Sequence, residues 1–354
     1  MKMRKNLLLI LLFLSTVVFG QDYKVFHTSA CYDMLSSFDS YEKLISNPFF
    51  KNTLARDSNF IADIKSINQK VRPSNICNFY ASLPSDKTNT KECYLFLKSL
   101  RKEDIPDEFM GQYVENIFSV MPQILNVVEK LIDADYQKYW EEQVYPMLKR
   151  NIDSFTFEEG ILDKIHEELI KMSGNGNLSD EYPKIFILDI DNAFSLNDET
   201  FCCTPVLLDK ETAKKYRINF IQVYIHENLH RLHLSKTLIQ ELEKLYEEDD
   251  FYRKNENVAR NYGEGLNEAF VVAAETHISQ KLGLRTDYDV YTEFKEYVGG
   301  SLVLAPIVYS FLSLKDDKQP FDSFLLNLFE TGIIKSGNIE KQYNEIMTRL
   351  KNNT

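Results

Sequence analysis

The chain has 354 residues, 27% of them charged, with a formal net charge of -12. This length predicts two structural units rather than one. The acidic charge is spread along the chain, which is typical of a soluble protein, and it argues against nucleic acid as a partner because such partners need a basic surface.

The N-terminus has the three regions of a secretory signal peptide over residues 1–20. Residues 1–6 are basic, residues 7–19 are almost wholly apolar, and Val18 and Gly20 satisfy the small-residue rule for cleavage. The apolar run is short for a membrane span, and no later run reaches membrane length. We therefore expect an exported protein, periplasmic or secreted, with no stable membrane span and a formal charge of -15 after cleavage, from 38 basic and 53 acidic residues.

Residues 21–172 are predicted to form a helical N-terminal region. The clearest pattern lies in residues 113–130, where apolar side chains recur at helical spacing. These side chains are Val114, Ile117, Phe118, Met121, Ile124, Leu125 and Val128. Nothing in this region identifies a ligand.

The pattern changes after residues 173–177, which contain Gly and Asn and end the helical region. Residues 184–190 and 200–208 are predicted to be strands. Helices are expected again near residues 301–314, 321–329 and 339–351. The fold class is therefore α+β and mostly helical.

Five cysteines in an exported chain leave at least one unpaired. Cys77 and Cys93 are close enough in sequence to bridge a short loop. Cys202 and Cys203 are adjacent and could bridge each other only with strain. Their spacing predicts no second metal site.

The run from His226 to His230 reads HENLH, which has the HExxH spacing of a zinc-peptidase helix. Residues 218–247 carry apolar side chains at mostly helical spacing, so the motif is expected on one amphipathic helix. Side chains four apart share a helix face, which directs both imidazoles toward one metal ion. Glu227 would lie beside the open coordination position and take a proton from bound water. The pattern predicts metal-assisted hydrolysis with Zn²⁺ as the cofactor.

A catalytic zinc site usually takes three protein ligands and leaves the fourth position to water, so a third ligand is expected. Residues 261–277 form a second helix-like stretch that is rich in oxygen and nitrogen ligands. Its candidates are Glu264, Glu268, Glu275 and His277. The three carboxylates share one helix face and His277 lies near its end, so geometry leaves all four open.

HENLH followed by LNE at residues 266–268 resembles the gluzincin zinc metallopeptidases, in which a Glu from a later helix joins the HExxH histidines. The chain also resembles, more loosely, uncharacterised secreted bacterial gluzincin-like proteins, and the resemblance covers roughly residues 184–280. It favours Glu268 as the third ligand. Glu264, which matches the alternative EG form, is the runner-up. The 38 positions between His230 and Glu268 exceed the spacing in compact members of the clan.

The resemblance implies a zincin-like domain over residues 178–354, with a small antiparallel sheet ahead of the HExxH helix. An edge strand of that sheet would pair with an extended peptide or protein substrate through backbone hydrogen bonds. Gluzincin-like enzymes commonly add a Tyr or His that stabilises the oxyanion. Tyr262, Tyr297 and Tyr309 are the candidates for this role.

Other polar side chains are expected to support the site without binding the metal. Asn267, Glu264 or Glu275 would orient the ligand imidazoles. His233 follows His230 by three residues, but three turns of one helix spread their side chains over about 10 Å, too far for one tetrahedral ion. His233 is therefore expected to be a supporting or structural residue.

The expected function is an exported zinc-dependent peptidase with Glu227 as the general base. The first alternative is a non-catalytic protein of the same fold that binds zinc or captures a peptide. The second is an envelope interaction protein that acts through its helical N-terminal half. The intact Glu227 argues against the first alternative, because a structural zinc ion has no use for a general base.

Overall fold

The computed structural model divides into two compact units. Unit 1 comprises Met1–Thr156 and Pro183–Arg217, and unit 2 comprises Phe157–Tyr182 and Ile218–Thr354. The residues that the structure describes are 25–39, 44, 47, 49–51, 53–83, 89–105, 112–174, 184–191, 193–197, 200–209, 220–232, 234–262 and 264–353. The predicted signal peptide, residues 1–20, lies outside them.

The two units divide the chain differently from the predicted boundary at residues 173–177. The strands expected in the second domain belong to unit 1, and the helix before them belongs to unit 2. The reason is a strand near the N-terminus, β1 (Phe26–His27), which pairs with β2 (Lys184–Ile187) and keeps this part of the chain in unit 1.

Unit 1 is built mainly from short helices. They are α2 (Ala30–Ser36), α4 (Ser58–Asn68), α5 (Pro73–Ser82), α6 (Thr90–Ser99), α7 (Gln112–Ser119), α8 (Met121–Asp133), α9 (Tyr136–Tyr139) and α10 (Tyr145–Ser154), with a π-helical turn at Trp140–Val144 and single 3₁₀ turns at Ser37–Asp39, Leu54–Arg56, Lys102–Asp104 and Pro205–Leu208. The helix predicted over residues 113–130 is in fact two helices. Pro122 lies in the first turn of α8, where proline starts a new helix well but cannot continue an old one.

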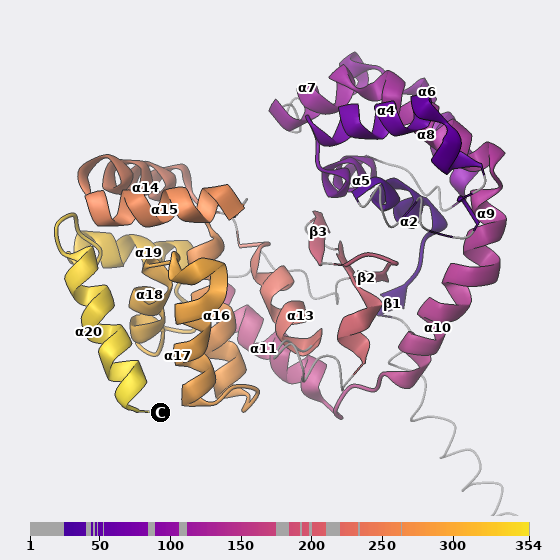
Figure 1. Ribbon diagram of the computed structural model, residues 1–354. Helices are drawn as coiled ribbons and strands as arrows, with labels where there is room; N and C mark the ends of the chain where they lie inside the picture. Colours follow the sequence, from indigo (N-terminus) through magenta and orange to yellow (C-terminus); the bar gives the residue numbers. More distant parts are fainter. Residues whose placement is uncertain are drawn as a thin grey trace, which may run out of the picture. The chain divides into compact units, whose positions relative to one another are not determined.

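The sheet of unit 1 has four strands in the order β1-β2-β4-β3, where β3 is Phe194–Asn197 and β4 is Thr200–Cys203. β1 pairs with β2 and β2 pairs with β4 in parallel, and only β3 is antiparallel to its neighbour β4. Figure 1 shows these strands beside α2 and α5, within the same unit.

The prediction of a small antiparallel sheet is therefore wrong. β3 lies between the two predicted strands in the sequence and runs opposite to both, so β2 and β4 run in the same direction. The second predicted strand also ends early, because Pro205 begins a 3₁₀ turn that is capped by the Thr204 hydroxyl.

All five cysteines lie in unit 1, and all are buried free thiols. Neither of the two considered bridges is present. Instead, the Cys31 thiol contacts Cys93 and the Cys202 thiol contacts Cys77. The helices that carry Cys31, Cys77 and Cys93 pack against one another, which brings residues far apart in sequence into one apolar core.

Unit 2 is helical throughout its described residues. Its helices are α11 (Ile161–Ser173), α13 (Phe220–Leu229), α14 (Lys236–Glu248), α15 (Asp250–Tyr262), α16 (Glu268–Lys281), α17 (Asp287–Glu296), α18 (Leu304–Leu312), α19 (Phe321–Glu330) and α20 (Ile339–Asn352), with a 3₁₀ turn, η8 (Tyr297–Gly300), after α17. The mostly helical prediction is confirmed, and so are the three predicted C-terminal helices, now α18 to α20.

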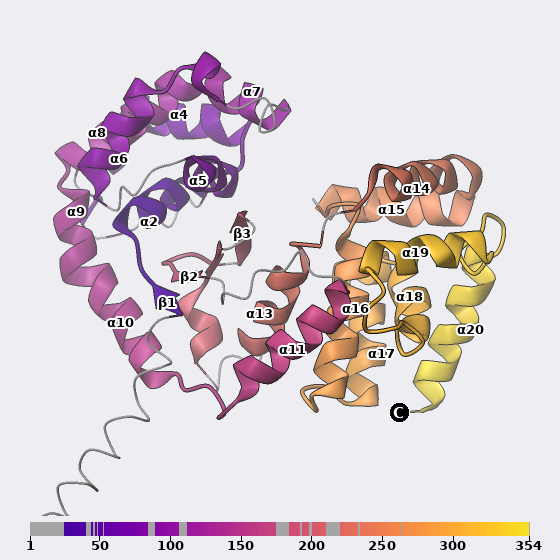
Figure 2. The same cartoon turned by 180° about the vertical axis from the view of Figure 1, so that it is seen from behind.

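The central element of unit 2 is α16, which is buried on nearly every side. It packs against α11, α13, α17 and α18, and Figures 1 and 2 show α16, α17 and α18 side by side. Its middle is lined with small and branched apolar side chains, from Val271 to Ala274. None of the described helices has both the length and the apolar character that a membrane span requires.

Candidate metal centre

The HExxH residues lie at the end of α13. The predicted helix over residues 218–247 is interrupted here: α13 ends at Leu229, and α14 begins after Ser235, whose hydroxyl accepts a hydrogen bond from Leu238 N at 3.2 Å. Ser235 N is itself tied to Asp322 Oδ1 at 2.9 Å, which fixes the start of the new helix. His230 N still donates to His226 O at 3.3 Å, so the two imidazoles keep the one-turn spacing of a helix.

Glu268 is the first residue of α16. The stretch predicted as one helix over residues 261–277 is broken, because α15 ends at Tyr262 and the chain turns before α16 begins. The turn closes where Glu268 N donates to Gly265 O at 3.1 Å. The carboxylate of Glu268 is nearly fully buried, at 3% of its side-chain surface exposed.

Three side chains converge at this point: His226, His230 and Glu268. The two Nε2 atoms are 3.1 Å apart, His226 Nε2 lies 3.4 Å from Glu268 Oε1, and His230 Nε2 lies 3.5 Å from Glu268 Oε2. Within the described part of the chain, this is the group of His, Cys, Asp and Glu side chains whose ligand atoms are close enough to hold a metal ion. Each of the three residues offers one ligand atom, so together they could bind a single ion.

The pKa values of the three side chains are shifted in different directions. Burial acts to lower the pKa of His226, but the hydrogen bond and charge of Glu268 outweigh it and raise this pKa to about 9. Burial, and next the positive charge on His226, lower the pKa of His230 to about 4. Burial acts to raise the pKa of Glu268, whereas His226 and then His230 bring it down to about 2. At neutral pH the metal-free centre therefore contains a carboxylate, a protonated His226 and a neutral His230.

Two neighbouring residues hold the ligands from outside. Asn267 Nδ2 lies 3.3 Å from His230 Nδ1, and the Tyr297 hydroxyl donates to Glu268 Oε1 at 2.8 Å. A metal ion held by Nε2 of His230 would leave the proton on Nδ1, and the Asn267 amide, turned over, would accept it through its oxygen. These contacts fix the ring and the carboxylate in place, as outer partners of metal ligands do.

Glu227 follows His226 on α13 and is buried, with 9% of its surface exposed. Its charge is close enough to His226 to favour the protonated imidazole. It is absent from the group of three that share ligand distances. Glu227 is therefore placed beside the centre without being one of its ligands.

The other predicted ligand candidates are not among the three side chains that converge. Glu275 is buried and bound to Arg285 NH2 at 3.0 Å and Ser279 Oγ at 2.6 Å, so its lone pairs serve an ion pair. His277 packs near the Tyr309 ring, at 6.3 Å between centroids. Glu264 lies in the turn before α16, and His233 lies outside the described residues.

Of the three candidate tyrosines, the structure brings only Tyr297 to the centre. Its ring lies 6.4 Å from that of His226. Tyr309 donates its hydroxyl hydrogen to Gln280, and Tyr262 is 62% exposed at the end of α15. Burial, followed by the charge of Glu268, raises the pKa of Tyr297, so the hydroxyl keeps its proton.

Two features of the site were missed in the sequence. Arg285 bridges Glu275 and Glu293 as a buried cation, with 8% of its side chain exposed. Val298, next to Tyr297, has a left-handed backbone with φ of 49°. The Gly-Gly pair that follows Val298 is a turn signal that could have located this segment.

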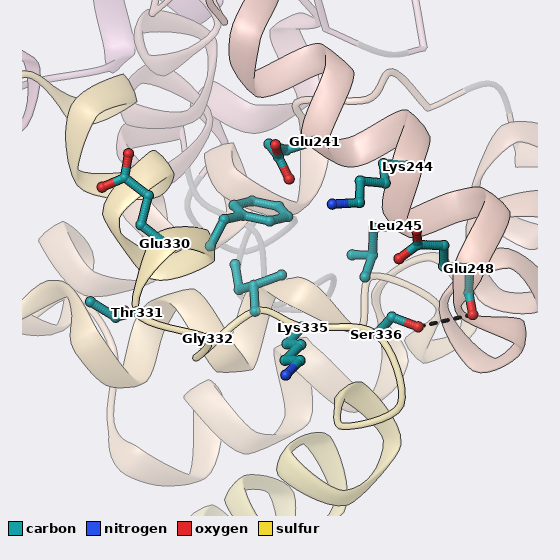
Figure 3. Close-up of a pocket in the computed structure, with 11 residues that line it drawn as sticks. Glu241, Lys244, Leu245, Glu248, Glu330, Thr331, Gly332, Lys335 and Ser336 are labelled. Carbon is teal, nitrogen blue, oxygen red and sulfur yellow. Dashed lines mark hydrogen bonds between the residues drawn. The ribbon is translucent and has the colours of Figure 1, made fainter.

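A separate surface pocket of about 490 Å³ lies between α14 and α19 and includes none of the metal-site residues. Figure 3 shows Glu241 and Lys244 on one side of it and Thr331 and Lys335 on the other. Its charges are of both signs, so the pocket does not select a ligand of one charge.

Comparison with protein-family models, with curated proteins and with solved structures gives no match to this chain.

Proposed function

We propose that this protein is an exported zinc-dependent peptidase whose metal ligands are His226, His230 and Glu268. The observation that carries the proposal is the spacing of the donor atoms: the two Nε2 atoms are 3.1 Å apart, and they lie 3.4 and 3.5 Å from different oxygens of the Glu268 carboxylate. Tetrahedral Zn²⁺ with bonds of about 2.0–2.1 Å places neighbouring donors about 3.3–3.4 Å apart. Two imidazoles and one carboxylate are also the donor set of known catalytic zinc sites that leave one position open.

Bound Zn²⁺ would supply Lewis-acid chemistry, polarising a carbonyl and making water more acidic. The protein's own contribution to proton transfer is Glu227. Its carboxylate takes a proton from the water that attacks the peptide carbonyl and then gives that proton to the leaving amine. Asn267 holds the His230 ring in the orientation that presents Nε2 to the ion.

The zincin-like fold and the export of the chain are also parts of the proposal. Export is supported by the sequence of residues 1–20, whose basic, apolar and small-residue regions are in the required order. The sheet that the gluzincin resemblance would place beside the cleft belongs to unit 1, whereas the three ligands belong to unit 2.

Glu227→Gln tests the proposed function. We expect one zinc ion per chain in both the wild type and the variant, while hydrolysis of an unfolded protein falls by about 10²- to 10⁴-fold in the variant. Glu243→Gln, an exposed position on α14, is the matched control and should keep the wild-type rate. Near wild-type hydrolysis by Glu227→Gln would refute the assigned role. A wild type that binds zinc without hydrolysing peptides would favour the non-catalytic alternative.

A further inference from the structure

The hydroxyl of Tyr297 contacts one oxygen of the buried Glu268 carboxylate. The contact is a hydrogen bond of 2.8 Å to Oε1, the oxygen that faces His226, while Oε2 faces His230. A tyrosine hydroxyl has one hydrogen to donate. Because that hydrogen is given to Glu268, the structure supports a positioning role for Tyr297 in place of the oxyanion role that the gluzincin resemblance implies.

The backbone just after Tyr297 is in an unfavourable conformation. Val298 has φ 49° and ψ 37°, a left-handed conformation that a β-branched residue rarely adopts. Gly299 and Gly300 are left-handed as well, and a Cβ on Gly300 would lie 2.7 Å from Lys295 O. Three left-handed residues in succession allow the chain to reverse tightly between α17 and α18.

The surrounding structure holds this conformation at both ends. Tyr297 N donates to Glu293 O in the last turn of α17. Val298 O accepts from Ser301 Oγ at 2.7 Å and from Ser301 N at 3.3 Å, and Ser301 is buried. A strained residue persists only where its neighbours determine its conformation, and such residues cluster at functional sites.

We propose that the turn Tyr297–Gly300 positions Glu268 for metal binding, and that the strained backbone at Val298 is retained because it directs the Tyr297 hydroxyl onto the carboxylate. The turn fixes one oxygen of Glu268 toward His226 before any ion arrives. A ligand held in its binding geometry loses less conformational freedom on binding, so the turn increases metal affinity. The proposal rests on the proposed metal centre and is independent of peptide hydrolysis.

The test is Zn²⁺ affinity, measured on the full chain by competition with a chromophoric chelator, together with the thermal midpoint of the metal-free protein. Tyr297→Phe should weaken Zn²⁺ binding by about 10- to 100-fold, the usual cost of losing an outer partner of a ligand. Val298→Gly should raise the thermal midpoint, because glycine relieves the strain, and yet weaken binding by about threefold or more. Asparagine tolerates the left-handed conformation better than valine does, so Val298→Asn serves as a second strain-relieving variant.

Two controls isolate the effect. Asp135→Gly relieves the other left-handed non-glycine residue, φ 62°, which lies in unit 1. Tyr246→Phe removes a hydroxyl that makes a 2.8 Å hydrogen bond to Asn257 in unit 2. Both should leave Zn²⁺ affinity unchanged.

Several results would overturn the proposal. Stabilised Val298 variants with wild-type affinity would show that the strain does not serve the metal. A Tyr297→Phe protein that binds Zn²⁺ normally but has a lower kcat would return Tyr297 to the oxyanion role. Equal losses of affinity in the controls would indicate a general loss of stability. A wild-type protein that binds Zn²⁺ but hydrolyses no peptide would defeat the proposed function alone.

Discussion

The two units bury different kinds of polar chemistry. Among the described residues, unit 1 contains five buried thiols and one buried carboxylate, Asp33, whereas unit 2 contains no cysteine and six buried carboxylates. Burying a charge is costly unless it is paired, so a unit that keeps six of them must provide partners for them. The partners identify which carboxylates have a structural role.

Four of the six carboxylates in unit 2 are bound to cationic side chains or to backbone N–H groups. Glu168 binds Lys171 and Lys281, Glu256 binds Arg260, Glu275 binds Arg285, and Asp249 accepts from the backbone N–H groups of Tyr252 and Gly337. Glu268 differs because it faces two imidazoles, of which His230 is neutral and His226 carries a proton that a metal ion could displace. In unit 1, Asp33 accepts from Trp140 Nε1 and Asp189 N, both at 2.6 Å, which is a structural arrangement. A buried carboxylate thus indicates function when its partners are imidazoles, which can also bind a metal ion.

The largest expected difference between the units is in metal binding. Glu268→Ala removes a ligand, and because even an outer partner is worth about 10- to 100-fold, we expect Zn²⁺ affinity to fall by at least about 1,000-fold. Glu264→Ala should cost less than about tenfold, since Glu264 lies outside the group of three. Competition with a chelator measures both. Greater loss from Glu264→Ala would show that the third ligand has been misassigned.

The matched change in unit 1 is Asp33→Ala. It leaves the donors of Trp140 and Asp189 buried without their acceptor, so we expect the free energy of unfolding to fall by about 2 kcal/mol. Zn²⁺ affinity should stay at the wild-type value. A large loss of metal from this variant would mean that the centre depends on unit 1, and the comparison between the units would fail.

Ion pairs allow a second comparison of stability between the two units. Arg285→Ala leaves the Glu275 carboxylate, whose side chain is 3% exposed, without its cation. It should lower the free energy of unfolding by about 3 kcal/mol, the lower end of the range for breaking a buried pair. Lys149→Ala in unit 1 removes an exposed pair with Asp153, where the Lys side chain is 54% exposed, and should cost less than about 0.5 kcal/mol. Denaturant unfolding measures the free energy lost by each variant. Similar losses would contradict the distinction between the buried and the exposed ion pair.

The spacing of the HExxH motif was sufficient to predict that the His226 and His230 side chains meet. His230 follows His226 by four positions, which corresponds to about one helical turn, and the turn survives even though α13 ends at Leu229. Glu268 was favoured by the local LNE pattern and by the resemblance. It follows His230 by 38 positions, so tertiary packing and not local spacing brings it to the two histidines. The residue beside it, Asn267, was likewise among the predicted supporting residues.

Other features depend on long-range structure that local patterns do not contain. The direction of the sheet depends on β1 and β3, two short strands that carry little periodic signal, and on which neighbours they choose. Tyr297 could not be selected from 20 tyrosines, because its role depends on the turn at Val298, and a valine in a left-handed conformation contradicts its local preference. Arg285 was missed because its two carboxylate partners lie on different helices.

Metal binding in unit 2 should depend on pH with a defined sign. The raised pKa of His226, about 9, means that at neutral pH an incoming ion must displace its proton. Affinity should therefore rise about tenfold per pH unit from pH 5 toward 9, and more steeply below the His230 pKa of about 4, where a second proton is displaced.

The stability of the metal-free protein should depend on pH with the opposite sign. The His226–Glu268 pair stabilises the fold fully below the ordinary His pKa, and this stabilisation is lost as pH rises toward 9, where His226 loses its proton. At the acid end it is lost as pH falls toward 2, where Glu268 gains one. Calorimetric titration in buffers of different ionisation enthalpy should detect about one proton released per Zn²⁺ at pH 7. Release of no proton would contradict the protonation of His226.

The smallest expected effect concerns the thiols of unit 1. Burial, followed by contact with Cys93, raises the pKa of Cys31, and burial, followed by contact with Cys77, raises the pKa of Cys202. Thiols of raised pKa stay protonated at neutral pH, and a metal ligand or nucleophile has to be a thiolate, so these groups act as small apolar side chains. Cys31→Ala and Cys202→Ala should each lower the free energy of unfolding by about 1 kcal/mol, the typical cost of a small buried deletion. Neither should change the zinc content. Loss of zinc from either variant would place a metal site in unit 1, and the assignment of metal chemistry to unit 2 alone would then be wrong.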